Sequence, residues 1–248
     1  MRGGAFQGVP PCFFMLSVYG ELPPGYKMID GSEKDYGDDR YFTRLAAAYV
    51  RGKLGGFAPR LPPEELIAAG LASGLRLHKF KRNAELPRVR KVLGILRALA
   101  PSSLLDVGSG RGTFLWPLLD AFPGIEVTAI DINPVRIDDI TAVREGGLSN
   151  LRALRMDAAE MELEDNGVEV VTALEVLEHL PAPVKAAGEA IRVASKYVIA
   201  SVPSKEDENP EHIHLFDRSG FESLFLAAGA QSVKVEFVLN HMIAVAKV

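Results

Sequence analysis

A short apolar run that leads into a glycine-rich loop places the strongest constraint on the fold of this chain. The run Leu104–Val107 is followed directly by Gly108-Ser109-Gly110-Arg111-Gly112, and an amphipathic segment near 112–122 comes next. Glycine lets the backbone turn tightly and approach a ligand where a Cβ atom would clash. In open α/β sheets, nucleotide-like ligands bind at the end of such a first strand. The feature therefore predicts an α/β fold with a ligand site at this strand end.

The rest of the C-terminal part alternates short apolar runs with amphipathic stretches, which indicates a parallel sheet covered by helices on both faces. The predicted strands are 103–107, 126–130, 151–156, 169–173 and 197–202, and the predicted helices lie near 112–122, 134–145, 183–194 and 218–228. Two further apolar runs, one on each side of Asn240-His241, are so closely joined that they must pair antiparallel. We expect a mostly parallel seven-stranded sheet that ends in an antiparallel hairpin.

The N-terminal part differs in character from this α/β pattern. Residues 1–37 are rich in Gly and Pro without a sustained period, so we expect an irregular lead. Residues 38–85 are expected to be helical, with an apolar stripe at Phe42, Leu45, Tyr49 and Leu54. We predict that this segment covers the ligand cleft of a domain spanning 86–248 and that the stripe packs on the cleft rim.

The amino-acid composition limits the class of protein and the binding partners that we expect for this chain. Hydrophobic residues make up 48% and charged residues 24% of its 248 residues, which is typical of a folded domain. The 28 basic against 32 acidic residues argue against nonspecific binding to nucleic acid or to an anionic membrane. A single cysteine, Cys12, excludes an internal disulfide framework. We expect a cytoplasmic monomer or homodimer that has no membrane partner.

Three acids stand at the ends of successive predicted strands: Asp106, Asp131 and Asp157. A dinucleotide site would need glycine at position 113, where this chain has Thr113. Asp106 would repel a pyrophosphate beside the loop but would attract an ammonium group. Asp131 could accept hydrogen bonds from the two hydroxyls of a ribose, and Asp157 from the amine of a purine. Together they describe one elongated ligand: a cationic amino acid, a ribose and an adenine.

These features resemble those of class I S-adenosylmethionine-dependent methyltransferases over about Leu86 to Val248. The resemblance implies a Rossmann-like sandwich and S-adenosylmethionine as the cofactor. It also implies a set of cofactor-binding positions along the successive strand ends. They are Asp106, Gly108, Ser109 and Gly110 around the methionine part, Asp131 at the ribose, Ile132, Asp157 and Ala158 at the adenine, and Leu174 at the sulfonium.

Candidate catalytic residues follow the fourth and fifth predicted strands. If a helical turn starts after Leu174, Glu175, Glu178 and His179 share one face. This stretch resembles the E-V-L-E-H-L signature of small-molecule methyltransferases, and His212 matches a histidine in the family's loop after the fifth strand. The side chains of Glu175 and His179 could simply fasten the loop. Alternatively, His179 or His212 could act as a general base, since the pKa of histidine is near 6.5. A divalent metal held by all four residues is the third alternative.

The resemblance predicts methyl transfer to an O or N atom, less readily to a C atom, of a small-molecule acceptor. We expect His179 and His212 to be catalytic and expect no metal. A metal-dependent RNA 2′-O-methyltransferase using Glu175, Glu178, His179 and His212 is one alternative, and a noncatalytic S-adenosylmethionine-binding protein is another. A run of seven basic residues between Arg76 and Lys91 is either a solvated helix face or a surface that steers an anionic substrate.

Overall fold

The structure, a computed structural model, describes residues 42–55, 61–82, 86–205 and 208–248. The irregular lead predicted for residues 1–37, with Cys12, lies outside the described residues. Within the described ranges, no helix is both long enough and apolar enough to cross a membrane.

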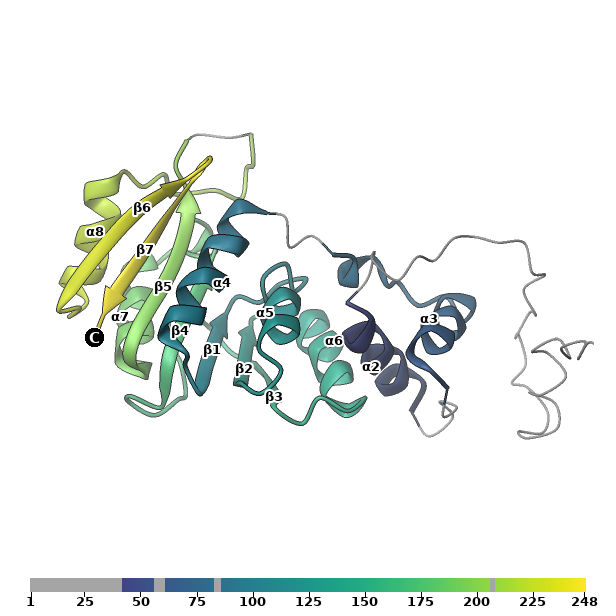
Figure 1. Ribbon diagram of the computed structural model, residues 1–248. Coiled ribbons are helices and arrows are strands. Elements are labelled where there is room, and N and C mark those ends of the chain that lie inside the picture. Colours follow the sequence, from purple (N-terminus) through teal and green to yellow (C-terminus); the bar gives the residue numbers. More distant parts are fainter. Residues whose placement is uncertain (1–41, 56–60, 83–85, 206–207) are drawn as a thin grey trace, which may run out of the picture.

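A seven-stranded sheet forms the centre of the molecule (Figure 1), with the strand order β3-β2-β1-β4-β5-β7-β6. The strands are β1 Ser103–Val107, β2 Glu126–Asp131, β3 Leu151–Arg155, β4 Val168–Leu174, β5 Ala194–Pro203, β6 Ser232–Val238 and β7 His241–Lys247. The first five strands run parallel, whereas β7 pairs antiparallel with both β5 and β6. The predicted sheet with its C-terminal hairpin is confirmed. Because β1 lies between β2 and β4, the chain reverses its direction of winding there, where α/β sheets bind ligands.

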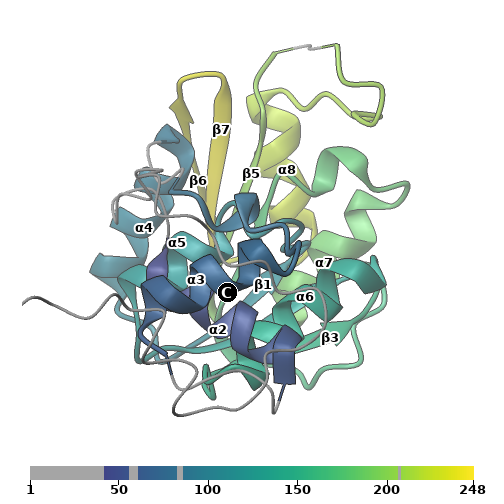
Figure 2. The same cartoon turned by 90° about the vertical axis from the view of Figure 1, so that its right-hand side faces the viewer.

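Helices cover both faces of this sheet, with α4 and α5 on one side and α7 and α8 on the other (Figure 2). The helices of the α/β domain are α4 Pro87–Leu99, α5 Leu115–Ala121, α6 Pro134–Glu145, α7 Pro183–Val193 and α8 Arg218–Ala227. Asn133 caps α6 by accepting a hydrogen bond from the Val135 N–H at 3.0 Å, and Asp217 caps α8 in the same manner. The predicted starts of α6 and α8 are therefore confirmed. Helix α5 begins three residues later than predicted because Gly112 still belongs to the loop.

The N-terminal helices α2 (Thr43–Leu54) and α3 (Pro63–Ala72) extend the layer that contains α4, α5 and α6. Helix α2 packs along α6, while Tyr49 of the predicted apolar stripe contacts the Phe80 ring and donates to Asp139, so the predicted packing on the cleft rim is not what Tyr49 does. Glycines permit this close approach: a Cβ atom on Gly52 would lie 1.9 Å from the Ala142 carbonyl oxygen, and one on Gly146 would lie 1.7 Å from that of Ala48. The helical segment therefore shares one continuous apolar core with the α/β domain.

The α2–α6 contact can be tested by adding a single methyl group. Gly146→Ala places a Cβ atom against the α2 backbone, and overpacking of this kind costs about 1–3 kcal/mol. We expect the free energy of unfolding, measured in a denaturant titration, to fall by that amount. Gly94→Ala on α4 is the matched control, since no atom lies within 4 Å of its added Cβ, and it should stabilise the protein by up to about 1 kcal/mol. Equal effects of the two substitutions would contradict the packing.

Candidate active site

The glycine loop after β1 is shaped by backbone geometry that other residues would not tolerate. Gly108 has a φ of +66° and Gly112 a φ of +82°, and a Cβ atom on either would clash with Val176 or with the ring of Trp116. The Gly108 N–H donates to the Ile130 carbonyl oxygen at 2.8 Å, which holds the loop against the end of β2. The loop therefore presents its backbone at the sheet edge where the ligand was predicted.

Asp106 is the buried acid beneath this loop, with a side chain only 2% exposed. Its Oδ1 accepts a hydrogen bond from Thr172 Oγ1 at 2.8 Å, while its Oδ2 is buried and has no hydrogen-bond partner among the described residues. Burial raises the pKa of Asp106 to about 6, and the hydrogen bonds from Ser109 and Thr172 only partly oppose this shift. An ammonium group would supply the missing partner, so this site fits the amino-acid end of S-adenosylmethionine.

Asp131, at the end of β2, binds both neighbouring loops. Its Oδ2 accepts from the Gly110 N–H and its Oδ1 from the Asn133 N–H, each at 2.8 Å. Each carboxylate oxygen has further acceptor capacity, which suits the two hydroxyls of a ribose. Beside it, Ile132 exposes 63% of its surface, an apolar face of the kind that an adenine would cover. Asp131 and Ile132 thus fit the ribose and adenine positions that the resemblance implies.

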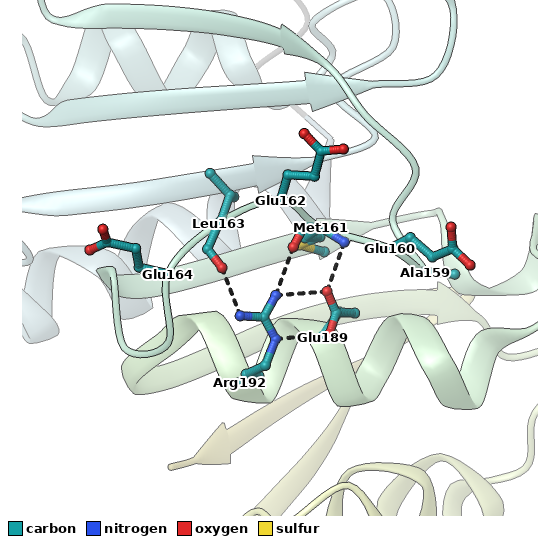
Figure 3. A pocket seen from close by; sticks show the side chains of 8 residues that line it. All are labelled: Ala159, Glu160, Met161, Glu162, Leu163, Glu164, Glu189 and Arg192. Carbon is teal, nitrogen blue, oxygen red and sulfur yellow. Dashed lines mark hydrogen bonds and ion pairs between the residues drawn. The ribbon is translucent and has the colours of Figure 1, made fainter.

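Asp157 and Ala158 follow β3 on a loop that Arg192 of α7 fastens (Figure 3). The guanidinium donates to the carbonyl oxygens of Leu163 at 2.7 Å and Met161 at 2.8 Å, while Glu189 accepts from the Met161 N–H. A surface hollow of about 780 Å³ lies here, but the polar groups drawn between loop and helix already bind one another. We therefore interpret these contacts as holding in place the loop that carries Asp157 and Ala158, and we assign no ligand to the hollow.

The end of β4 places Leu174 and Glu175 in the cofactor cleft, a cavity of about 190 Å³ that Asp106 and Gly110 also line. Glu175 has a φ of +57°, a strained conformation for a residue with a side chain. Its carboxylate accepts from Ser201 Oγ at 2.6 Å and pairs with His241 Nε2 at 3.0 Å. Sequence reasoning missed Ser201 and His241, because only the antiparallel pairing of β7 with β5 brings His241 to this edge.

The two candidate catalytic histidines meet beside a buried carboxylate. Glu178 is fully buried, and one ligand atom from each of Glu178, His179 and His212 lies within 4.8 Å of the others. The helical turn spans only Leu177–His179, so the prediction that Glu175 shares its face is wrong. Glu175 instead points to Ser201 and His241.

Backbone hydrogen bonds hold the two loops of this cluster together. The amides of Ile213 and His214 both donate to the main-chain carbonyl oxygen of Glu178, at 2.9 and 3.2 Å. His179 Nδ1 lies 2.9 Å from the Glu211 carbonyl oxygen, and the His179 and His212 ring centroids are 4.7 Å apart. The segment before α8 is thus fixed against the turn after β4, which positions both imidazoles.

Comparison with known proteins agrees with this fold. The sequence profile of the methyltransferase domain family matches residues 101–232, more than half of the chain. No curated protein matches the chain. A similar solved structure is a SAM-dependent methyltransferase from Aquifex aeolicus, which is 24% identical with a TM-score of 0.53 and covers 66% of this chain and 91% of its own.

Two other structures share the fold at lower identity. An O-methyltransferase family protein from Burkholderia thailandensis is 14% identical, with a TM-score of 0.54, and covers 65% of this chain and 55% of its own. A SAM-dependent methyltransferase from Thermotoga maritima, described as a possible histamine N-methyltransferase, is 16% identical, with a TM-score of 0.52, and covers 66% and 92%. At these identities the comparison shows the fold and leaves the acceptor open.

The sheet and its covering helices define a Rossmann-like domain of the kind that uses S-adenosylmethionine. The chain belongs to the methyltransferase domain family, and it is a class I S-adenosylmethionine-dependent methyltransferase.

Asp131→Ala tests the assignment of the ribose position. It removes acceptors for two ribose hydroxyls as well as the bonds to Gly110 and Asn133, and hydrogen bonds to a charged group are worth about 1.5–3 kcal/mol each. We expect at least a tenfold loss of S-adenosylmethionine affinity by calorimetry. Asp138→Ala, an exposed acid on α6, is the control and should bind normally. Unchanged affinity in Asp131→Ala would contradict the assignment.

Asp106→Asn is expected to change the stability of the protein and its affinity for the cofactor in opposite directions. Because burial raises the pKa of Asp106 from 3.8 to about 6, the folded protein binds a proton more tightly than the unfolded chain. Ionised Asp106 therefore destabilises the cofactor-free protein above pH 6, and this effect disappears as the pH falls towards 4. At pH 7 we expect Asp106→Asn to raise the free energy of unfolding by roughly 3 kcal/mol.

The same substitution should weaken S-adenosylmethionine binding at least tenfold at pH 7, because the ammonium loses its anionic partner. Denaturant titrations at pH 7 and pH 4, with calorimetry at pH 7, measure both effects. Asp138→Asn provides the control for removal of one exposed negative charge. A variant less stable than the wild-type protein at pH 7 would contradict the account of Asp106.

Proposed function

We propose that this enzyme transfers the methyl group of S-adenosylmethionine to an oxygen or nitrogen of a small-molecule acceptor. In this proposal, His179 and His212 are the catalytic residues that remove the proton of the acceptor. The observation that carries the proposal is the meeting of these two imidazoles beside the buried Glu178 carboxylate. This cluster begins four residues after Leu174, which lines the cofactor cleft. The predicted cytoplasmic location and the monomeric or dimeric state stay predictions.

The protein's part in the reaction is chiefly to bind and to orient. Asp106 and the glycine loop would hold the amino-acid end of the cofactor, and Asp131 its ribose. When bound, S-adenosylmethionine supplies an already activated methyl group on its sulfonium. Catalysis then depends mainly on aligning the acceptor with that methyl group and on excluding water. Such a reaction needs only one further group, a base that accepts the proton of the attacking hydroxyl or amine.

His179 is suited to accept that proton. Its Nδ1 faces the Glu211 carbonyl oxygen, which can only accept a hydrogen bond, so Nδ1 carries the ring proton. The lone pair of Nε2 is then the basic position. A carboxylate oxygen of Glu178 lies within 4.8 Å of a ring nitrogen of His179. His212, whose ring meets that of His179 edge-on, completes the same polar cluster.

A metal-dependent reaction is the second candidate, and the grouping of ligand atoms from Glu178, His179 and His212 favours it. A divalent ion held there could bind an acceptor hydroxyl and lower its pKa. The RNA 2′-O-methyltransferase alternative also uses Glu175, yet Glu175 contacts Ser201 and His241 instead. Because the four-residue set is divided in this way, the general base is the better supported of the two.

The base and the metal forecast opposite responses to a chelator. With a general base, methyl transfer should persist in EDTA, and His179→Ala or His212→Ala should lower it about 10²–10⁴-fold at pH 7. The residual activity of each variant should rise with pH as the acceptor loses its proton unaided. S-adenosylmethionine affinity, measured by calorimetry, should stay unchanged and so serves as the control for folding.

The contrary result is equally specific. Stoichiometric metal in the purified protein, with activity lost in EDTA and restored by Mg²⁺, Mn²⁺ or Co²⁺, would replace the base with a metal. In that case, His179→Ala and His212→Ala should each weaken metal binding, whereas Asp131→Ala should not.

A further inference from the structure

A second cavity, of about 350 Å³, adjoins the cofactor cleft. It is lined by Arg76, His78, Lys79, Arg111, Arg136 and Asp139, and we call it the basic cavity. Arg111 lines both this cavity and the cofactor cleft, so the two are neighbours. The basic cavity therefore lies beside the cofactor cleft, on the side formed by the N-terminal segment, the glycine loop and α6.

The positive charge of this cavity is not neutralised by its own acid. Asp139 already pairs with Lys79, lies 3.4 Å from Lys53 Nζ, and accepts a hydrogen bond from the Tyr49 hydroxyl at 3.1 Å. Among the described residues, no carboxylate forms an ion pair with the guanidinium of Arg76, Arg111 or Arg136. Three guanidinium groups thus line one cavity without an anionic partner among the residues that the structure describes.

Some residues of the basic cavity come from a part of the chain that the methyltransferase family profile does not match. Arg76, His78 and Lys79 follow α3 and lie outside residues 101–232, where the family profile matches. Arg111 belongs to the glycine loop and Arg136 to the first turn of α6. The N-terminal segment therefore adds cationic groups to one side of the cofactor site. S-adenosylmethionine carries an ammonium, a sulfonium and a single carboxylate, so one guanidinium can pair with that carboxylate, and the remaining cationic groups of the basic cavity would attract a further anion.

We propose that the basic cavity binds an oxyanion, a phosphate or a carboxylate, carried by the methyl acceptor. This inference rests on the proposed function and narrows its substrate class to anionic small molecules. Guanidinium groups suit the role because their planar donors bind two oxygens of a phosphate or carboxylate at once. Lys79 is held in place by its contacts with Asp139 and with the Tyr49 hydroxyl, which also donates to Asp139. The basic residues at positions 76 and 79 thus gain a specific role within the predicted basic run.

Calorimetric titration with inorganic phosphate tests the site without requiring turnover. The protein is saturated with S-adenosylhomocysteine, ionic strength is held constant with chloride, and the double variant Arg76→Gln/Arg136→Gln is compared with the wild-type protein. Neither substituted residue lines the cofactor cleft. We expect phosphate affinity to fall at least tenfold in the double variant. Arg144→Gln/Arg218→Gln, which removes two exposed charges elsewhere, is the matched control and should bind phosphate like the wild-type protein.

Several results would overturn the proposal. One is that the wild-type protein and the double variant bind phosphate with equal affinity. Another is that the control variant loses as much phosphate affinity as the double variant. A third is that saturating S-adenosylhomocysteine abolishes phosphate binding. A parallel titration with acetate distinguishes the two oxyanions, because a phosphate subsite should prefer phosphate and a carboxylate subsite should bind acetate. S-adenosylmethionine affinity is measured on the same samples, so failure of the cofactor assignment is seen separately.

Turnover supplies an independent readout for the substrate class. Labelled S-adenosylmethionine is offered with hydroxyl and amine acceptors in phosphorylated, carboxylated and neutral forms. The proposal expects methyl transfer to an anionic form, with a KM that rises at least tenfold in the double variant while kcat changes little. Transfer to neutral acceptors alone would overturn the oxyanion subsite and leave the proposed methyltransferase function standing.

Discussion

The burial of one carboxylate beneath the glycine loop is the constraint on which the rest of the site depends. Asp106 is placed at the centre of the sheet, where β1 is flanked by strands on both sides, and one of its oxygens lacks a partner among the described residues. An acid in that position destabilises the cofactor-free protein and is useful only if a cation completes it. Asp131 then ties the loop to the next strand end through the Gly110 amide. The two acids therefore prepare one continuous site from the amino-acid end to the ribose.

The sign of the charge changes across Arg111. On one side lies the cofactor cleft, where Asp106 and Glu175 stand beside Arg88, and on the other lies the basic cavity, to which the N-terminal segment contributes three residues. That segment can contribute because α2 is fixed on α6 through glycine–alanine contacts, and because Asp139 of α6 binds Tyr49 of α2 and Lys79. A structural contact between helices thus also determines which side chains reach the edge of the active site.

Much of this arrangement could be predicted from the sequence, and the exceptions have physical reasons. Strand ends carrying Asp106 and Asp131 were predictable because apolar runs followed by acids are local patterns. The packing of α2 on α6 was not predictable, since the small residues Ala48 and Gly52 reveal a close helix contact only when both helices are known. The conformation of Glu175 was also hidden: its positive φ is maintained by Ser201 and by His241, which the β5–β7 pairing supplies. Long-range pairing of this kind leaves no local signal.

In the histidine cluster, main-chain hydrogen bonds position the loops, whereas the side chains of Glu178, His179 and His212 carry the reactive groups. The loop that carries His212 is anchored by amides of Ile213 and His214 to the main-chain oxygen of Glu178, and the His179 ring adds one side-chain contact to the Glu211 carbonyl oxygen. A substitution of His179 or His212 therefore removes a reacting group while the loop keeps its backbone anchors. The same anchors would serve a base or a metal, because a base needs one imidazole and a metal needs several ligand atoms, and this cluster offers both. The choice between those chemistries thus lies in the side chains alone, and the fold itself is compatible with either.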